Sequence, residues 1–169
     1  MADPIPTPFD EPSTLPFGLP PFAEIRDEHY EPAFERGMAQ QLAEIQDIVG
    51  QGDAPTFENT LVPLEESGQL LDRVAEVFFN KASSDSNDAT DDLEERIAPR
   101  LAAHSDAILL DPQLYTRVRT LHDALDTGDP VAAEWDAEQR YLAERWFTEM
   151  TLAGAGLDDA RKARLTQLN

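Results

Sequence analysis

The sequence contains no cysteine, and this absence removes several classes of protein at once. Without thiols the chain forms no disulfides, so nothing supports a secreted fold built on cross-links. Thiolate metal sites are excluded too, which leaves histidine, aspartate and glutamate as metal ligands. Long apolar runs are also missing, and Met1-Ala2-Asp3-Pro4 does not resemble a signal peptide. We therefore expect a cytoplasmic protein with no membrane partner.

Basic residues are scarce: 13 Lys and Arg face 34 Asp and Glu, a formal charge of -21. Such a surface repels phosphate backbones, which predicts that nucleic acid is not a partner. The plain interpretation of the charge is a well-solvated surface that favours solubility. Adaptation to salt and attraction of cationic peptides are the alternatives.

Proline is abundant only at the start of the chain, which predicts an extended arm over residues 1–26. Seven of the 13 prolines lie there, at positions 4, 6, 8, 12, 16, 20 and 21. The arm also carries the apolar residues Phe9, Leu15, Phe17, Leu19 and Phe22. Because these are too many for a freely solvated linker, we expect the second half of the arm to lie against an apolar surface. That surface belongs either to the helices of this chain or to a part of the protein outside it.

After the arm, apolar residues recur at steps of three and four, the spacing of one helical face. The pattern predicts a helix over 32–49 and a second, continuous one from Thr56 or Asn59 through Gly68 to Phe79, ended by the polar residues 85–88. A third should begin near Asn87 or Thr90 and carry Leu93, Ile97, Leu101 and Ile108 inward, with a possible kink at Pro99.

Cap and stop residues define the remaining helices. Asp111-Pro112 predicts the start of a fourth helix, and Gly128-Asp129-Pro130 its end. A fifth should begin at Asp136 and stop at 154–156. No alternating strand pattern and no fixed repeat occurs. The predicted fold class is therefore all-α, a bundle-like segment of about five or six helices without a sheet.

The resulting division is an arm over 1–26 that packs on the helices, a helical domain over 27–156 and the start of a further helix over 157–169. Asp158 resembles the cap of that last helix, which runs for only about three turns before the sequence stops. The expectation is that this helix is truncated.

Candidate catalytic residues are few. None of His29, His104 and His122 is followed by Glu, so the His-Glu-x-x-His helix of zinc peptidases is absent from these residues. None has Glu three positions before it, which disfavours a di-iron site. Without a Ser, Cys or carboxylate arrangement around it, His104 is interpreted as structural. We predict no catalytic, cofactor-binding or metal-binding residue in this chain.

Two further groups of residues are interpreted as structural. The acidic stretch from Asp85 to Asp92 offers oxygen ligands, but an EF-hand would need Gly at 90 and Glu at 96, where the chain has Thr90 and Arg96. A solvated loop with a helix cap is favoured over a weak cation site, although a cation-buffering bundle stays open. The aromatic residues are expected in the core rather than in a ligand cage. They are Phe78, Phe79, Trp135, Tyr141, Trp146 and Phe147.

Several segments together resemble a known family. In order they are 15–22 (LPFGLPPF), 25–34 (IRDEHYEPAF), 55–60 (PTFENT), 64–71 (LEESGQLL), 77–80 (VFFN) and 97–106 (IAPRLAAHSD). This series is similar to the amino-terminal region of the thimet oligopeptidase and peptidyl-dipeptidase family of zinc metallopeptidases, in particular bacterial peptidyl-dipeptidase and oligopeptidase A. The matching residues His29, Tyr30, Asn59, Thr60 and His104 have a simpler interpretation as helix caps or core polar groups.

The resemblance implies a parent enzyme that hydrolyses short peptides with one zinc, held by a His-Glu-x-x-His helix in a later, carboxy-terminal catalytic lobe. It also implies that this segment is a non-catalytic part of the substrate-channel wall and inactive alone. The alternative is an autonomous acidic helical module that binds peptides or proteins without enzymatic activity. If the segment is incomplete, apolar surface that the rest of the protein would cover is exposed, and we expect the isolated segment to self-associate through it.

Overall fold

The computed structural model describes residues 6–158 and residue 161. Within these residues every regular element is a helix and no strand occurs, which confirms the predicted all-α class. Backbone contacts divide the chain into two compact units. The first unit comprises residues 1–43 and 68–103, and the second comprises residues 44–67 and 104–169.

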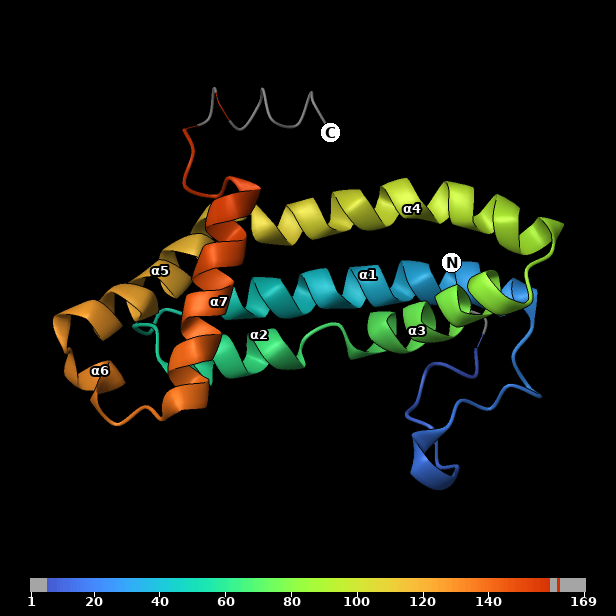
Figure 1. Cartoon of the computed structure of the whole chain (residues 1–169), viewed down its shortest axis with the longest axis horizontal. Helices are drawn as coiled ribbons and strands as arrows, with labels where there is room; N and C mark the ends of the chain where they lie inside the picture. The colour runs from blue at the N-terminus through green and yellow to red at the C-terminus, as the bar shows by residue number, and fades with distance from the viewer. Residues whose placement is uncertain (1–5, 159–160, 162–169) are drawn as a thin grey trace. The chain divides into compact units, whose positions relative to one another are not determined.

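The first unit is built from the arm and three helices (Figure 1). It takes residues 27–43 of α1 (Asp27–Val49), all of α3 (Gln69–Ser84) and residues 88–103 of α4 (Asp88–Leu109). Its buried core combines apolar residues from all three helices with Phe9 of the arm. The members are Phe9, Tyr30, Ala33, Phe34, Met38, Leu70, Leu71, Val74, Val77, Phe78, Leu93 and Ile97. The inward positions predicted for the third helix are confirmed at Leu93 and Ile97.

Edge-to-face contacts between aromatic rings connect α1 and α3 in this core. The ring of Phe78 on α3 meets Tyr30 at a centroid distance of 5.2 Å and Phe34 at 5.4 Å, both edge-to-face. Such pairs add about 0.5–1.5 kcal/mol to the stabilisation from buried area. Phe78 is therefore a core residue, as predicted. Its neighbour Phe79 was predicted to be buried as well, but it is exposed.

The first helix starts earlier than the sequence pattern predicted. α1 begins at Asp27, so Pro32 lies in its second turn rather than at its start. The side chain of His29 explains the early start, because its Nδ1 accepts the backbone N–H of Arg26 at 3.1 Å. A side chain in the first turn that reaches back in this way satisfies a donor that the helix leaves unpaired.

The second predicted helix is interrupted, and the expectation of one continuous helix is wrong. A π-helical turn, η2 (Phe57–Leu61), leads into the short α2 (Val62–Glu66), and α3 begins only at Gln69. Between them Ser67 is extended and Gly68 takes the left-handed conformation, with φ 81°. Glycine adopts this conformation without the steric cost that a Cβ would add. A helical apolar period continues across such a break, which is why the pattern did not reveal it.

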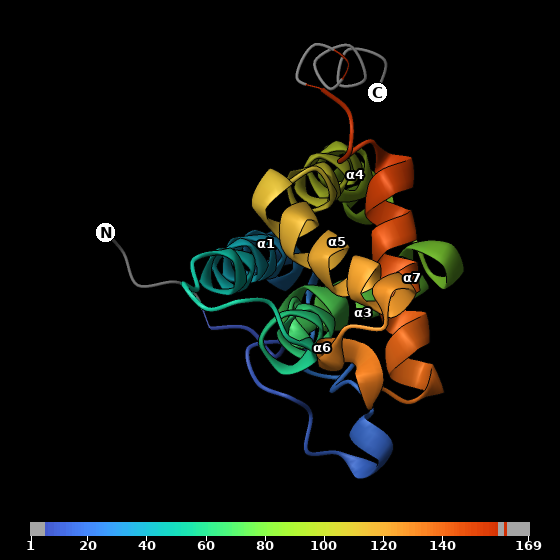
Figure 2. The ribbon, with the colours of Figure 1, turned by 90° about the vertical axis from the view of Figure 1, so that its left-hand side faces the viewer.

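The second unit contains η2, α2, the ends of α1 and α4, and three later helices. These are α5 (Pro112–Thr127), α6 (Pro130–Ala133) and α7 (Ala137–Ala153). α5 packs against α6 and α7 (Figure 2). Both α5 and α7 also touch η2. Leu114, Val118 and Leu121 of α5 are completely buried, as their spacing predicted.

The predicted caps in this unit are confirmed. Asp111 Oδ1 accepts the backbone N–H groups of Gln113 and Leu114, each at 2.8 Å, and Asp136 accepts that of Gln139 at 2.9 Å. Gly128 ends α5 in the left-handed conformation. Pro130 was expected only to prevent continuation, but it opens the short helix α6 behind the cap Asp129.

The described part of the arm is less extended than predicted: it contains the 3-10 turn η1 (Pro16–Gly18) and further turns at residues 8–9 and 22–24. Phe9, from the first half of the arm, is buried in the core, whereas four apolar residues of the second half are exposed. Those exposed residues are Leu15, Phe17, Leu19 and Phe22. Other parts of the second half do lie against the helices, because Ile25 packs on the core and Pro20 and Pro21 line a cavity together with Val77 of α3. Of the further helix expected over 157–169, residues 159–160 and 162–169 lie outside the described part of the chain.

Candidate functional site

A buried arginine organises the polar residues of the second unit. Arg117 lies on α5 and its side chain is only 7% exposed. Its guanidinium donates to Asn59 Oδ1 at 2.9 Å, to Thr60 Oγ1 at 3.2 Å and to the Asp53 carbonyl at 3.2 Å. Three neutral oxygens from one segment of chain thus hold a cation that is largely removed from water.

The acceptors around Arg117 are themselves positioned by a helix cap. Thr56 caps η2 through its Oγ1, which accepts the Asn59 N–H at 3.1 Å, while Asn59 Oδ1 accepts the Thr56 N–H at 2.8 Å. Thr60 Oγ1 donates to the same Asn59 oxygen at 2.8 Å, and Asn59 Nδ2 donates to the Ala54 carbonyl at 2.9 Å. This reciprocal capping box fixes the turn onto which α5 packs.

Burial lowers the pKa of Arg117 from its ordinary value, and the nearby charge of Asp53 opposes this shift. Arginine nonetheless stays charged at neutral pH. A buried charge without its acceptors is costly, so the group binds the turn to the helix strongly. Because its donors are directed at these oxygens, Arg117 has a structural role and is not available to stabilise a negative charge on a substrate.

The burial of Arg117 has a signal in the sequence pattern. Leu114, Val118 and Leu121 define the buried face of α5, and position 117 falls on that same face. A charged residue on an apolar face calls for a buried partner. The partners, Asn59 and Thr60, were recognised only through the family resemblance.

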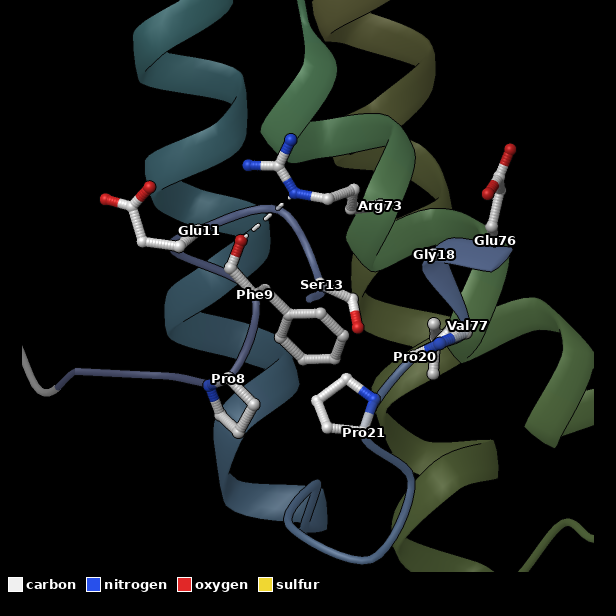
Figure 3. A pocket seen from close by; sticks show the side chains of 10 residues that line it. All are labelled: Pro8, Phe9, Glu11, Ser13, Gly18, Pro20, Pro21, Arg73, Glu76 and Val77. Atoms are coloured by element: carbon white, nitrogen blue, oxygen red, sulfur yellow. Dashed lines mark hydrogen bonds between the residues drawn. The ribbon is translucent and has the colours of Figure 1, made fainter. Parts of the chain in front are cut away.

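A second candidate lies in the first unit, where the arm crosses α3 (Figure 3). Arg73 Nε donates to the Phe9 carbonyl at 3.2 Å, the contact drawn as a dashed line in Figure 3. On the other side of the arm, Arg36 donates to Thr7 Oγ1 at 2.9 Å and pairs with Asp10. The base of the arm is therefore held from α1 and from α3.

Asp10 completes this attachment. Partial burial acts to raise its pKa, but hydrogen bonds from the Thr7 N–H and from Arg36 outweigh it and hold the pKa of Asp10 below its ordinary value. The Thr7 N–H donates to Asp10 Oδ2 at 2.8 Å. The carboxylate is thus stabilised in its charged form.

The cavity beside this attachment is small, with a volume of about 110 Å³. Sites for small molecules usually enclose about 300–1,000 Å³. Arg73, Glu76 and Val77 of α3 line it together with the arm residues Pro8, Phe9, Glu11, Ser13, Gly18, Pro20 and Pro21. The cavity is too small for a peptide and belongs to the junction between the arm and the helix.

The family-matching residues occupy structural positions. His29 caps α1, and Tyr30 is buried between Phe9 and Phe78 at centroid distances of 5.5 Å and 5.2 Å. Asn59 and Thr60 meet at Arg117. His104 is buried in α4, where desolvation lowers its pKa. The interpretation of these residues as caps and core polar groups agrees with these contacts.

The acidic stretch consists of a short capping loop, residues 85–87, and the start of α4, which begins at Asp88. Asn87 Oδ1 accepts the Thr90 N–H at 3.0 Å, and the preceding helix α3 ends at Ser84. Across residues 6–158 and 161, no group of three His, Asp or Glu side chains is placed to hold a metal ion. Nor does any helix in this part of the chain have the length and apolar character needed to cross a membrane.

The aromatic residues of α7 differ from the prediction. Tyr141 was expected in the core, yet it is 66% exposed, and Trp146 is only half-buried. Glu65 of α2 accepts from Trp146 Nε1 and pairs with Arg145, which draws the indole toward a polar partner. Phe147 instead stacks on His122 at 3.9 Å, and Trp135 packs edge-to-face on Phe57 at 5.4 Å.

Comparison with known proteins identifies relatives of this chain. A dipeptidyl carboxypeptidase of Escherichia coli K12 is 38% identical over 162 residues, which are 96% of this chain and 23% of that enzyme. One from Salmonella typhimurium LT2 is 40% identical over 157 residues, 93% of this chain and 22% of its own length. The chain is homologous to these enzymes.

Oligopeptidase A of E. coli K12 is also related, at 27% identity over 157 residues, 93% of this chain and 22% of its own length. The resemblance to the thimet oligopeptidase and peptidyl-dipeptidase family is thereby confirmed. The chain spans less than a quarter of the length of the curated relatives that it matches. No family model matches the chain.

Proposed function

We propose that the chain is the non-catalytic amino-terminal helical segment of a zinc-dependent oligopeptidase or peptidyl-dipeptidase, and that it forms part of the substrate-channel wall. The observation that carries this proposal is the pattern of similarity. Almost the whole chain aligns with dipeptidyl carboxypeptidases, but only 22–23% of their length is involved. The three histidines here lack the adjacent Glu of a zinc-peptidase helix.

The described residues do not come together as a zinc site, so no catalytic step is assigned to them. No triad of candidate ligands comes together in the described part, and the chain has no cysteine. In zinc peptidases the metal needs three protein ligands and an open position for water. The proposal places those ligands in a carboxy-terminal catalytic lobe outside these residues.

The contacts inside each unit suit a rigid wall. Arg117 is tied to the capped turn at Thr56, and the arm is tied to α1 and α3 through Arg36 and Arg73. Such a wall would limit access to short, unfolded peptides and help to exclude water when the lobes of the enzyme close. We assign short peptides as the substrates of the parent enzyme and a cytoplasmic location to it. The division into an arm over 1–26, a helical domain over 27–156 and a further helix from 157 remains part of the proposal.

A chimera tests this proposal. The 162 residues of E. coli dipeptidyl carboxypeptidase that align with this chain are replaced by the chain itself. The proposal predicts a folded chimera that hydrolyses short peptides and loses activity when zinc is chelated. Substituting the histidines of this chain, His29, His104 and His122, by Gln should leave zinc content at that of the unsubstituted chimera. A folded chimera without peptidase activity would favour the alternative, an autonomous interaction module.

A further inference from the structure

The second half of the arm forms an apolar knob, which we define as residues 13–22. Its side chains Leu15, Phe17, Leu19 and Phe22 are exposed, and the Phe17 side chain is 100% exposed. Figure 1 shows the turn at Pro16–Gly18, in blue, projecting from the helices of its unit. No charged residue occurs between Glu11 and Glu24, although 28% of the chain is charged. The knob is thus an uncharged apolar surface on a strongly acidic protein.

The knob has a defined shape. Ser13 Oγ donates to the Leu19 carbonyl at 2.6 Å and accepts the Leu15 N–H at 3.2 Å, which closes the loop across its base. Inside it, the Gly18 N–H donates to the Leu15 carbonyl at 3.0 Å. The neighbouring arm is held by Arg36 and Arg73, as described above. A loop tied at its base and within its turn is pre-organised for binding.

Phe17 has both a strained backbone conformation and a fully exposed side chain. Its φ of 61° places it in the left-handed region, where a residue with a Cβ is strained and where Gly or Asn is usual. Its ring is also fully in water, although phenylalanine is normally buried. Strain and exposure at one residue are typical of a side chain whose partner lies outside the chain.

We infer that the knob docks into an apolar pocket of the remaining part of the parent peptidase, with Phe17 as the anchor. This inference rests on the proposed function. The relatives continue for more than three times the length that aligns here, so they contain a large surface that this chain lacks. An acidic chain of charge -21 would meet another copy of itself with electrostatic repulsion, which favours the remainder of the enzyme over self-association as the occupant.

Hydrogen exchange on the isolated chain and on the active chimera tests the inference. Amides of the knob that exchange quickly in the isolated chain should exchange at least about tenfold more slowly in the chimera, as expected when an anchor residue is buried. Residues around Leu152 of α7, which is also exposed, serve as an internal reference. An active chimera whose knob exchanges as fast as in the isolated chain would overturn the inference and leave the proposed function intact. A folded but inactive chimera would contradict both.

A pair of variants, measured both in the isolated chain and in the chimera, gives a second test. In the isolated chain, Phe17→Gly should leave Tm nearly unchanged, because relief of the strain offsets the larger unfolded-state entropy of glycine and no internal contact is lost. In the chimera the same variant should lower Tm, whereas Phe17→Leu should lower it less. A fall of Tm in the isolated Phe17→Gly chain would mean that Phe17 already packs within this chain, and the inference would fail. Dimerisation of the active chimera that Phe17→Asp abolishes would assign the knob to a second copy and would also overturn it.

Discussion

Gly37 of α1 lies against the backbone of Leu71 on α3, so closely that a Cβ at position 37 would stand 2.8 Å from the Leu71 Cα. Real Cβ atoms do not approach a backbone atom this closely, so the two helices depend on the missing side chain for their separation. The aromatic contacts of Tyr30 and Phe34 with Phe78 are made across the same pair of helices.

The first prediction concerns this contact. Gly37→Ala should lower the free energy of unfolding by about 1–3 kcal/mol, because the added methyl group must push α3 away from α1. Gly52→Ala is the matched control, since nothing lies within 4 Å of its Cβ position. Urea denaturation followed by circular dichroism measures both. Equal stability of the Gly37→Ala variant and the original chain would contradict the packing described.

Arg117 gives the second prediction. Arg117→Ala removes the donors to Asn59, Thr60 and the Asp53 carbonyl, and it should cost about 2–4 kcal/mol of unfolding free energy. The control is Arg119→Ala on the same helix, where an exposed pair with Asp123 at 3.4 Å contributes about 0–1 kcal/mol. Similar losses in the two variants would show that burial of Arg117 is unimportant.

His104 makes the chain sensitive to mild acid. Desolvation lowers its pKa below the ordinary value of 6.5 in the folded state, so the unfolded state binds this proton more readily. The stability that His104 contributes is full above about pH 6.5 and is lost as the pH falls through that value toward the lower folded pKa. His104→Leu should therefore weaken the fall in unfolding free energy between pH 7 and pH 5. An identical pH profile in the variant would disprove the link.

The net charge predicts a response to salt. A formal charge of -21 on 169 residues opposes the compact state by self-repulsion, which ions screen over about 3–10 Å between 1 M and 0.1 M salt. Raising NaCl from 0.05 M to 1 M should increase Tm by several degrees. Neutralising two exposed carboxylates with Glu94→Gln and Glu95→Gln should reduce the increase. A Tm that falls with salt would contradict this electrostatic account.

Local chemistry explains which features the sequence predicted. Asp111, Asp136 and Asn87 cap helices through their own side chains and the next few backbone N–H groups, so neighbouring residues suffice to recognise them. The break at Gly68 was missed because glycine tolerates either a helical or a left-handed backbone. Only the fold decides between the two.

The contacts of the candidate site around Arg117 could not be predicted from the sequence. The Asn59, Thr60 and Arg117 contacts join residues that are 57 and 58 positions apart, and no local pattern specifies such a pairing. Tyr141 was misplaced for a related reason: its helical spacing matches the buried positions, but the face of α7 that meets α5 is set by packing. The buried positions on that helix are Ala143 and Met150.

The central claim is that the catalytic zinc is held outside this chain, and zinc binding by the isolated chain tests it most directly. Zinc is titrated calorimetrically into the purified 169-residue protein, and hydrolysis of a fluorogenic short peptide is measured in the same samples. The account predicts no stoichiometric zinc binding and no hydrolysis that a chelator abolishes. Binding of one zinc per chain together with chelator-sensitive turnover would contradict it.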